Sequence, residues 1–199
     1  MPKEIKLLEF PRISVFEDVV PLEVCDAMIE KYINAMNPNA GLESREQTYG
    51  QITEEVEQRS ISIDTDPADR AYFKSLLALA VAIPESHVEA GDIYQYTEGQ
   101  YFGLHHDYPY NPQVVPYYSK GGDRKATAIF WFNDNYEGGR CTFPELGVTV
   151  EPKKGSLMYF EYDYPDEEVN KSTIHESLPL TKGNKWIAAF FCSNGPRVE

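Results

Sequence analysis

The feature that most constrains the fold is a series of short strand-like runs that fills the chain from residue 88 onward. Runs rich in β-branched and aromatic residues alternate there with Gly, Pro, Asn and Asp, which mark turns. Short strands at this spacing are typical of a sandwich, barrel or jelly roll. We expect eight strands, near residues 90–97, 100–107, 126–132, 140–144, 147–151, 156–161, 172–178 and 185–192.

The first part of the chain has a different pattern and is expected to contain two helices. Apolar residues repeat at helical spacing over 21–36, and Asp66 followed by proline is an N-cap signal for a second helix that ends at Pro84. The fold class is therefore mainly β with N-terminal helices. We expect a single domain over 1–199, with a helical part (1–87) packed on a β core (88–199).

The net charge and the cysteines indicate which binding partners and which cell compartment to expect. The chain of 199 residues has 18 Lys+Arg against 32 Asp+Glu, a net charge of −14, which repels phosphate backbones and anionic membranes. No apolar run is long enough to cross a bilayer, and the charged N-terminus does not read as a secretory signal. The three cysteines form no CxxC pair. We expect a cytoplasmic protein, monomeric or homodimeric, with no nucleic-acid or membrane partner.

A histidine and a carboxylate two residues apart form the first candidate site. On a strand, His105 and Asp107 project from the same face, while His106 points the other way. His175, in another expected strand, is the natural third ligand. Two histidines and one carboxylate on one face of a metal are typical of non-haem Fe(II) oxygenases. The alternative for His105 and Asp107 alone is an ordinary His–Asp contact on a surface strand.

A lysine ten residues after His175 strengthens this interpretation. Pro179 and Gly183 mark a turn, so that Lys185 would lie in a strand beside His175 if the two strands pair. A buried ammonium needs an anion, and a dicarboxylate cosubstrate on the metal would supply it. The hydroxyl of Tyr96 could bind the same carboxylate.

Taken in order, these motifs resemble the Fe(II)/2-oxoglutarate-dependent dioxygenases, in particular their prolyl 4-hydroxylase-like branch. The resemblance covers nearly the whole chain. The stretches that carry it are 96–100 (YTEGQ), His105-His106-Asp107, 121–127 (GGDRKAT), 133–144 (NDNYEGGRCTFP), 155–160 (GSLMYF), and His175 through Lys185-Trp186.

The resemblance implies a double-stranded β-helix of the jelly-roll or cupin-like type and a set of site residues. His105, Asp107 and His175 would bind Fe(II), and Lys185, helped by Tyr96, would bind 2-oxoglutarate. Cys141 stands where prolyl hydroxylases often have a threonine that touches 2-oxoglutarate, so that contact is in doubt. The implied reaction couples oxidative decarboxylation of 2-oxoglutarate to hydroxylation of a C–H bond, with O2 as cosubstrate and ascorbate as a possible reductant.

The substrate is less defined than the chemistry. Arg124 matches an arginine that contacts substrate in the family, and the aromatic loop at 108–124, with Tyr108 and Tyr110, suggests a lid over a substrate. A peptidyl proline is the first expectation, and a free amino acid or another small molecule is the alternative. A non-catalytic jelly-roll binding module is a further alternative, although all four ligand and anchor positions are kept.

Overall fold

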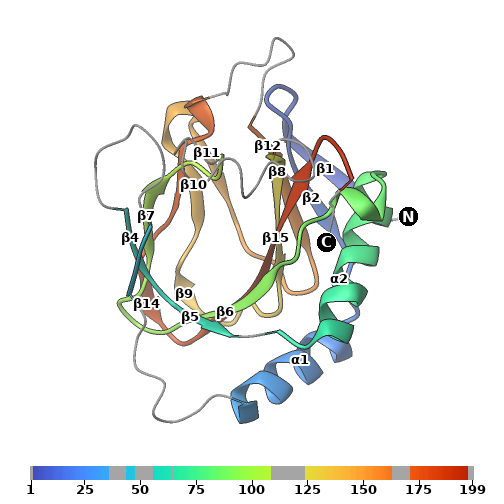
Figure 1. The fold of residues 1–199 in the computed structure, drawn as a ribbon. Coiled ribbons are helices and arrows are strands. Elements are labelled where there is room, and N and C mark those ends of the chain that lie inside the picture. The colour runs from blue at the N-terminus through green and yellow to red at the C-terminus, as the bar shows by residue number, and fades with distance from the viewer. Residues whose placement is uncertain are drawn as a thin grey trace.

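The computed structural model describes residues 2–35, 44–47, 56–63, 65–108, 124–162 and 171–196. The strands of these segments form two large antiparallel sheets that face each other (Figure 1). The seven-stranded sheet has the order β1 (Lys3–Leu8), β2 (Ile13–Glu17), β12 (Leu157–Glu161), β8 (Arg124–Trp131), β15 (Lys185–Ser193), β6 (Asp92–Tyr96) and β5 (Ile61–Ile63). The six-stranded sheet has the order β11 (Val148–Val150), β10 (Cys141–Phe143), β13 (His175–Ser177), β7 (Phe102–His105), β4 (Val56–Arg59) and β3 (Ser44–Gln47).

The eight strands expected from the sequence form a contiguous block of four in each sheet. The seven-stranded sheet contains β12, β8, β15 and β6 as neighbours, and the six-stranded sheet contains β11, β10, β13 and β7 as neighbours. The chain crosses repeatedly from one sheet to the other, as in a jelly roll. This arrangement confirms the double-stranded β-helix.

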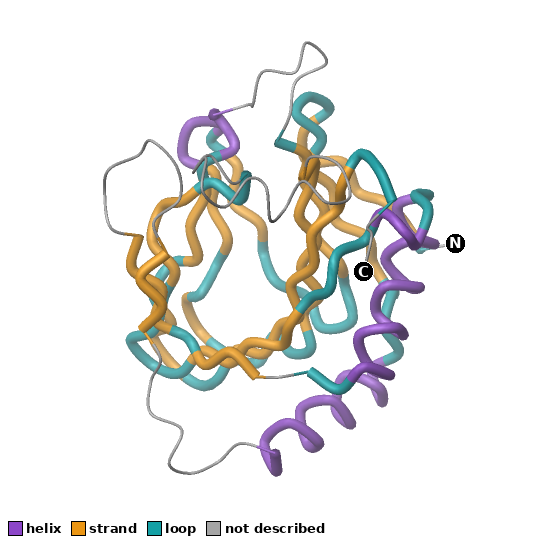
Figure 2. Tube along the Cα trace, in the orientation of Figure 1, coloured by secondary structure: helices purple, strands orange, loops and turns teal. Residues whose placement is uncertain are grey.

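Two helices cover the outer face of the seven-stranded sheet, as Figure 2 shows. Helix α1 spans Leu22–Ala35, and helix α2 spans Pro67–Val81, close to the ranges expected from the sequence. The side chain of Asp66 accepts a hydrogen bond from the Ala68 N–H at 2.8 Å, so it is the N-cap of α2. Three short 3-10 turns lie at Glu85–His87, Pro144–Leu146 and Lys171–Thr173.

Side chains alternate between two cores along the strands that are buried on both faces. Phe130 of β8 packs with the helices, and the next residue, Trp131, packs between the sheets. On β15, Trp186 faces the helices and Ile187 faces the interior. Because side-chain direction has a period of two, Lys185 shares the interior face with Ile187.

The first 87 residues contribute more than the two expected helices. The residues before α1 form β1 and β2, which pair antiparallel and extend the seven-stranded sheet through β12. The segment between α1 and α2, where no strand was expected, supplies β3, β4 and β5. A further small sheet, β9 (Glu137–Gly138) with β14 (Leu180–Lys182), was also not expected. These strands are short, and pairing with a neighbour defines them.

Candidate functional site

Three metal-ligating side chains meet between the two sheets, as the sequence predicts. His105 ends β7, Asp107 follows two residues later, and His175 begins β13, where its Cα pairs with that of His105. One ligand atom from each residue lies within 4.8 Å of the others, and all three residues are buried. The Nε2 atoms of His105 and His175 lie 3.4 and 3.5 Å from the two carboxylate oxygens of Asp107.

The orientation of both imidazoles suits a metal. His105 donates its Nδ1–H to the Gly103 carbonyl at 2.7 Å, and His175 donates its Nδ1–H to the Thr173 carbonyl at 3.0 Å. Because a carbonyl can only accept, Nδ1 carries a proton in both rings, and Nε2 is the ring nitrogen that faces Asp107. Backbone contacts of this kind commonly orient histidine ligands.

The protonation states also suit a metal. Burial raises the pKa of Asp107, but His175, His105 and the hydroxyl of Thr127 together lower it below its ordinary value. Burial and the neighbouring His105 lower the pKa of His175 to about 3. At neutral pH the site therefore offers an anionic carboxylate and a neutral His175, which are the forms that bind a divalent cation. Two histidines and one carboxylate fit Fe(II) in an oxygenase.

Thr127 contacts the carboxylate of Asp107, a role that was not expected from the sequence. Its hydroxyl donates to Oδ2 of Asp107 at 2.6 Å from strand β8 of the opposite sheet. Thr127 is four residues before Trp131 on β8, so it points to the same face as Trp131, which is the interior face. The alternation of side chains along β8 could have placed Thr127 on the interior face. The sequence does not show that its partner is Asp107 on the other sheet.

Lys185 enters the same interior from the seven-stranded sheet. Its side chain is 3% exposed, and its Nζ donates to the Gly139 carbonyl and to Oγ of Ser177, each at 2.7 Å. Burial lowers the pKa of Lys185 to about 8. Ser177 follows His175 by two residues on β13, a spacing of about 7 Å along a strand. The ammonium thus lies beside the strand that carries His175.

The prediction that Lys185 lies in a strand paired with that of His175 is wrong. The strand with His175 does not pair with the strand of Lys185: β13 pairs with β10 and β7, whereas β15 pairs with β6 and β8. A short strand, β14, separates them and pairs with β9. The lysine is opposite His175 across the space between the sheets because the chain changes sheets between the two residues.

Tyr96 and Cys141 both lie near the lysine. The Cα of Tyr96 pairs with that of Lys185 between β6 and β15, and the lysine Nζ is 4.8 Å from the centre of the Tyr96 ring. Cys141 pairs with Ser177 between β10 and β13. Burial raises the pKa of the Cys141 thiol to about 12, so it is neutral. Contacts of these two side chains with 2-oxoglutarate stay predictions.

Arg124 has internal partners that the sequence did not indicate. Its guanidinium is 3% exposed, pairs with Glu89 at 2.9 Å and donates to the backbone carbonyl of Asp107 at 3.0 Å. Its guanidinium carbon also lies 3.6 Å from the centre of the Phe191 ring. No local pattern singled out Glu89, which is 35 residues away along the chain. Contact of Arg124 with substrate stays a prediction.

His106 and the tyrosines complete the predicted set. As expected, His106 points away from the metal site. Its Nδ1 accepts from the Tyr108 N–H, and its Nε2 lies 3.0 Å from Oγ1 of Thr173. Tyr108 is partly buried against the interior core. Tyr110 and the expected lid lie outside the described residues, apart from Tyr108 and Arg124 at its ends.

Comparison with known proteins agrees with this geometry. The 2OG-Fe(II) oxygenase superfamily matches residues 91–193. A probable prolyl 4-hydroxylase 9 of Arabidopsis thaliana is 29% identical over 89% of this chain and 67% of its own length. The prolyl 4-hydroxylase subunit alpha-1 of Gallus gallus is 33% identical over 52% of this chain, but only 20% of its own length.

A solved structure with a similar fold is the viral collagen prolyl hydroxylase of Paramecium bursaria Chlorella virus-1 in complex with 2OG. It is 23% identical, has a TM-score of 0.62, and the match covers 90% of this chain and 94% of that one. None of the helices in the described segments is long and apolar enough to cross a membrane. The superfamily match spans more than half of the sequence and contains the whole buried triad together with Lys185. The chain therefore belongs to the 2OG-Fe(II) oxygenase superfamily and is an Fe(II)- and 2-oxoglutarate-dependent oxidoreductase.

Proposed function

We propose that this protein hydroxylates peptidyl proline, with His105, Asp107 and His175 as iron ligands and Lys185 as the anchor of 2-oxoglutarate. The observation that carries the residue assignment is the buried triad with an ammonium beside the same strand. The substrate class rests on the relatives named prolyl 4-hydroxylases. A prolyl hydroxylase of Trichoplax adhaerens, which shares the fold at a TM-score of 0.59, is solved with a peptide fragment of hypoxia inducible factor.

Each side chain has a distinct part in this proposal. His105 and His175 offer Nε2, and Asp107 offers a carboxylate oxygen while Thr127 holds the other. When bound, Fe(II) with 2-oxoglutarate and O2 supplies oxidative decarboxylation coupled to C–H hydroxylation.

Lys185 supplies the charge that a dicarboxylate requires at its far end. The ammonium is already held by Gly139 and Ser177, so it loses little further freedom when the anion binds. The walls around it are apolar, with Tyr96, Trp131 and Ile187 in the interior core. An ion pair in such surroundings is weakly screened, which favours a tight grip on one carboxylate.

The test has a binding step and a product step. Fe(II) and 2-oxoglutarate are added without oxygen, and the weak visible charge-transfer band of the bidentate complex is recorded. We expect the band in the wild-type protein and in Glu176→Gln, and we expect its loss in His175→Ala. Glu176 is a matched control because it follows His175 on the same strand and points to the opposite face.

The product step uses a proline-rich peptide and the same peptide with alanine in place of proline. With oxygen admitted, we expect the proline peptide alone to gain the mass of one oxygen atom, with succinate formed in equal amount. If a free amino acid were oxidised and neither peptide were, a small-molecule substrate would replace the peptide substrate in this proposal. A folded protein that gives no band would contradict the site assignment itself.

A further inference from the structure

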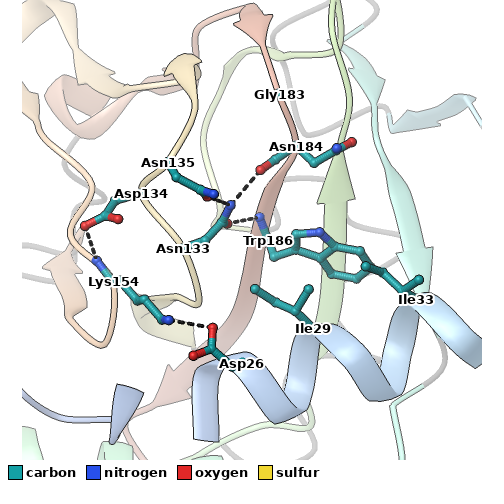
Figure 3. Close-up of a pocket in the computed structure, with 10 residues that line it drawn as sticks. All are labelled: Asp26, Ile29, Ile33, Asn133, Asp134, Asn135, Lys154, Gly183, Asn184 and Trp186. Carbon is teal, nitrogen blue, oxygen red and sulfur yellow. Dashed lines mark hydrogen bonds and ion pairs between the residues drawn. The ribbon is translucent and has the colours of Figure 1, made fainter. Parts of the chain in front are cut away.

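Asn133, two residues after the end of β8, lies beside a surface hollow of about 540 Å³ between α1 and the turns at the start of β15 (Figure 3). Its carboxamide bridges two backbone groups at the start of β15, one in Asn184 and one in Trp186. Oδ1 accepts from the Trp186 N–H at 2.8 Å, and Nδ2 donates to the Asn184 carbonyl at 2.7 Å. These groups belong to the two peptide planes that flank Lys185. The Asn133 side chain therefore restricts both backbone dihedrals of the lysine.

On the β8 side, main-chain strand pairing does not restrict the backbone of Lys185. The register between β15 and β8 begins at Ile187 opposite Trp131, which is two residues after Lys185. The Phe132 N–H still donates to the Trp186 carbonyl at 3.0 Å, and beyond that point the Asn133 carboxamide takes over. A carboxamide has one acceptor oxygen and donor hydrogens, so it can continue a strand ladder as a peptide group does.

The two side chains on either side of this bridge point to opposite faces. Trp186 packs with helix α1, near Ile29 and Ile33 in Figure 3, whereas the Lys185 ammonium meets Gly139 and Ser177 in the interior. A change in the backbone at this point would rotate the long lysine side chain away from its interior partners. Displacement of about 1 Å at a binding group can cost much of its effect.

We infer that Asn133 is a positioning residue for cosubstrate binding, which acts by holding the backbone of Lys185. The inference rests on the proposed role of Lys185 as the 2-oxoglutarate anchor. Asn133 does not touch the metal triad in the described structure: its hydrogen bonds go to Asn135, Asn184 and Trp186. It should therefore affect the cosubstrate and leave the metal alone.

The first measurement compares Asn133→Ala with Asn135→Ala. Asn135 accepts a hydrogen bond from Asn133 and lines the same hollow, but none of the hydrogen bonds at the start of β15 comes from its side chain in the described segments. Dissociation constants for Fe(II) and for 2-oxoglutarate are measured separately without oxygen. We expect 2-oxoglutarate binding about tenfold weaker in Asn133→Ala, as for the loss of hydrogen bonds that place a charged group. Fe(II) affinity in both variants, and 2-oxoglutarate affinity in Asn135→Ala, should change by less than about twofold.

The second measurement is a double-mutant cycle with Lys185→Met. If Asn133 acts through the lysine, Asn133→Ala weakens 2-oxoglutarate binding in the wild-type background and has no further effect in Lys185→Met. Equal losses in both backgrounds, or a parallel loss of Fe(II) affinity, would overturn the positioning role. If Lys185→Met alone binds 2-oxoglutarate normally, the proposed function of the lysine fails, a result that is separate from the Asn133 comparison.

A milder variant covers the case in which Asn133→Ala does not fold. Asn133→Asp keeps the acceptor for the Trp186 N–H and loses the donor to the Asn184 carbonyl and to Oδ1 of Asn135, and Asn135→Ala controls for the second loss. We expect a loss of 2-oxoglutarate affinity with unchanged Fe(II) affinity, abolished in Lys185→Met. Unaltered 2-oxoglutarate binding in Asn133→Asp would count against the inference.

Discussion

Replacement of Lys185 by methionine separates a ligand-binding lysine from a structural one. The side chain is 3% exposed and its ammonium lies among apolar walls, so a carboxylate bound to it would be well desolvated. Truncation of one partner in such a pair costs about 3 kcal/mol. At 1.4 kcal/mol per factor of ten, 2-oxoglutarate affinity should fall on the order of a hundredfold.

The stability of the fold should change far less. Burial lowers the pKa of Lys185 from 10.5 to about 8, which corresponds to roughly 3 kcal/mol against the charged form in the folded protein. Methionine removes this cost, and it also removes the hydrogen bonds to Gly139 and Ser177, each worth about 1.5–3 kcal/mol with a charged donor. The two effects oppose each other. At the lower end of that range the two bonds together, about 3 kcal/mol, offset the cost of burial, so we expect the free energy of unfolding at pH 7 to change by about 1 kcal/mol or less.

The pH dependence gives a second signature of the same group. The folded pKa of Lys185 is below its unfolded value, so between about pH 8 and 10.5 the unfolded chain holds a proton that the folded chain has released. In that window this lysine makes the wild-type protein more stable as pH rises, and Lys185→Met should lack the increase. Affinity for 2-oxoglutarate should fall above about pH 8, up to tenfold per pH unit, because the ammonium is lost.

The assay is an anaerobic 2-oxoglutarate titration of the Fe(II) protein, with urea unfolding on the same preparations. Lys182→Met is the matched control, since Lys182 is 70% exposed and pairs only with Glu137 among the described residues. Binding within twofold of wild type in Lys185→Met would refute the anchor role. A weakened affinity accompanied by a loss of several kcal/mol in stability would instead identify Lys185 as a structural residue.

Three further substitutions test the surroundings of the site. Thr127→Val removes the hydroxyl that holds Asp107, so Fe(II) affinity measured by equilibrium titration should fall about tenfold, and an unchanged affinity would contradict this role. Arg124→Met removes the guanidinium that pairs with the buried Glu89, so urea unfolding should show a loss of about 3–5 kcal/mol, whereas a loss below about 1 kcal/mol would show that the pair is dispensable. Phe73→Ala empties the helix–sheet core and should cost about 3–5 kcal/mol with little change in Fe(II) affinity, which thermal melts and the same titration would check.

The sequence by itself determined the features that repeat locally. The eight central strands were expected because turn residues bound each run, and side-chain direction in a strand has a period of two. The same period placed His105 and Asp107 together and His106 away from them, as the structure confirms. Helix α2 was expected because its N-cap chemistry lies within a few neighbouring residues. His175 was found as a histidine in another expected strand, and Lys185 was found from its spacing to His175 across a turn.

Only the tertiary structure decided which segments lie against each other. The polar runs that form β3 and β4 become strands through pairing with each other and with β7, and such pairing leaves no mark within a short segment. Lys185 reaches the site from the sheet opposite His175, although the two residues are close in sequence. Glu89 is 35 residues from its partner Arg124 along the chain. Asn133 is 53 residues from Trp186, whose N–H it accepts beside Lys185. Such contacts depend on strand register and on how the two sheets face each other, which long-range packing sets and local residue pattern does not.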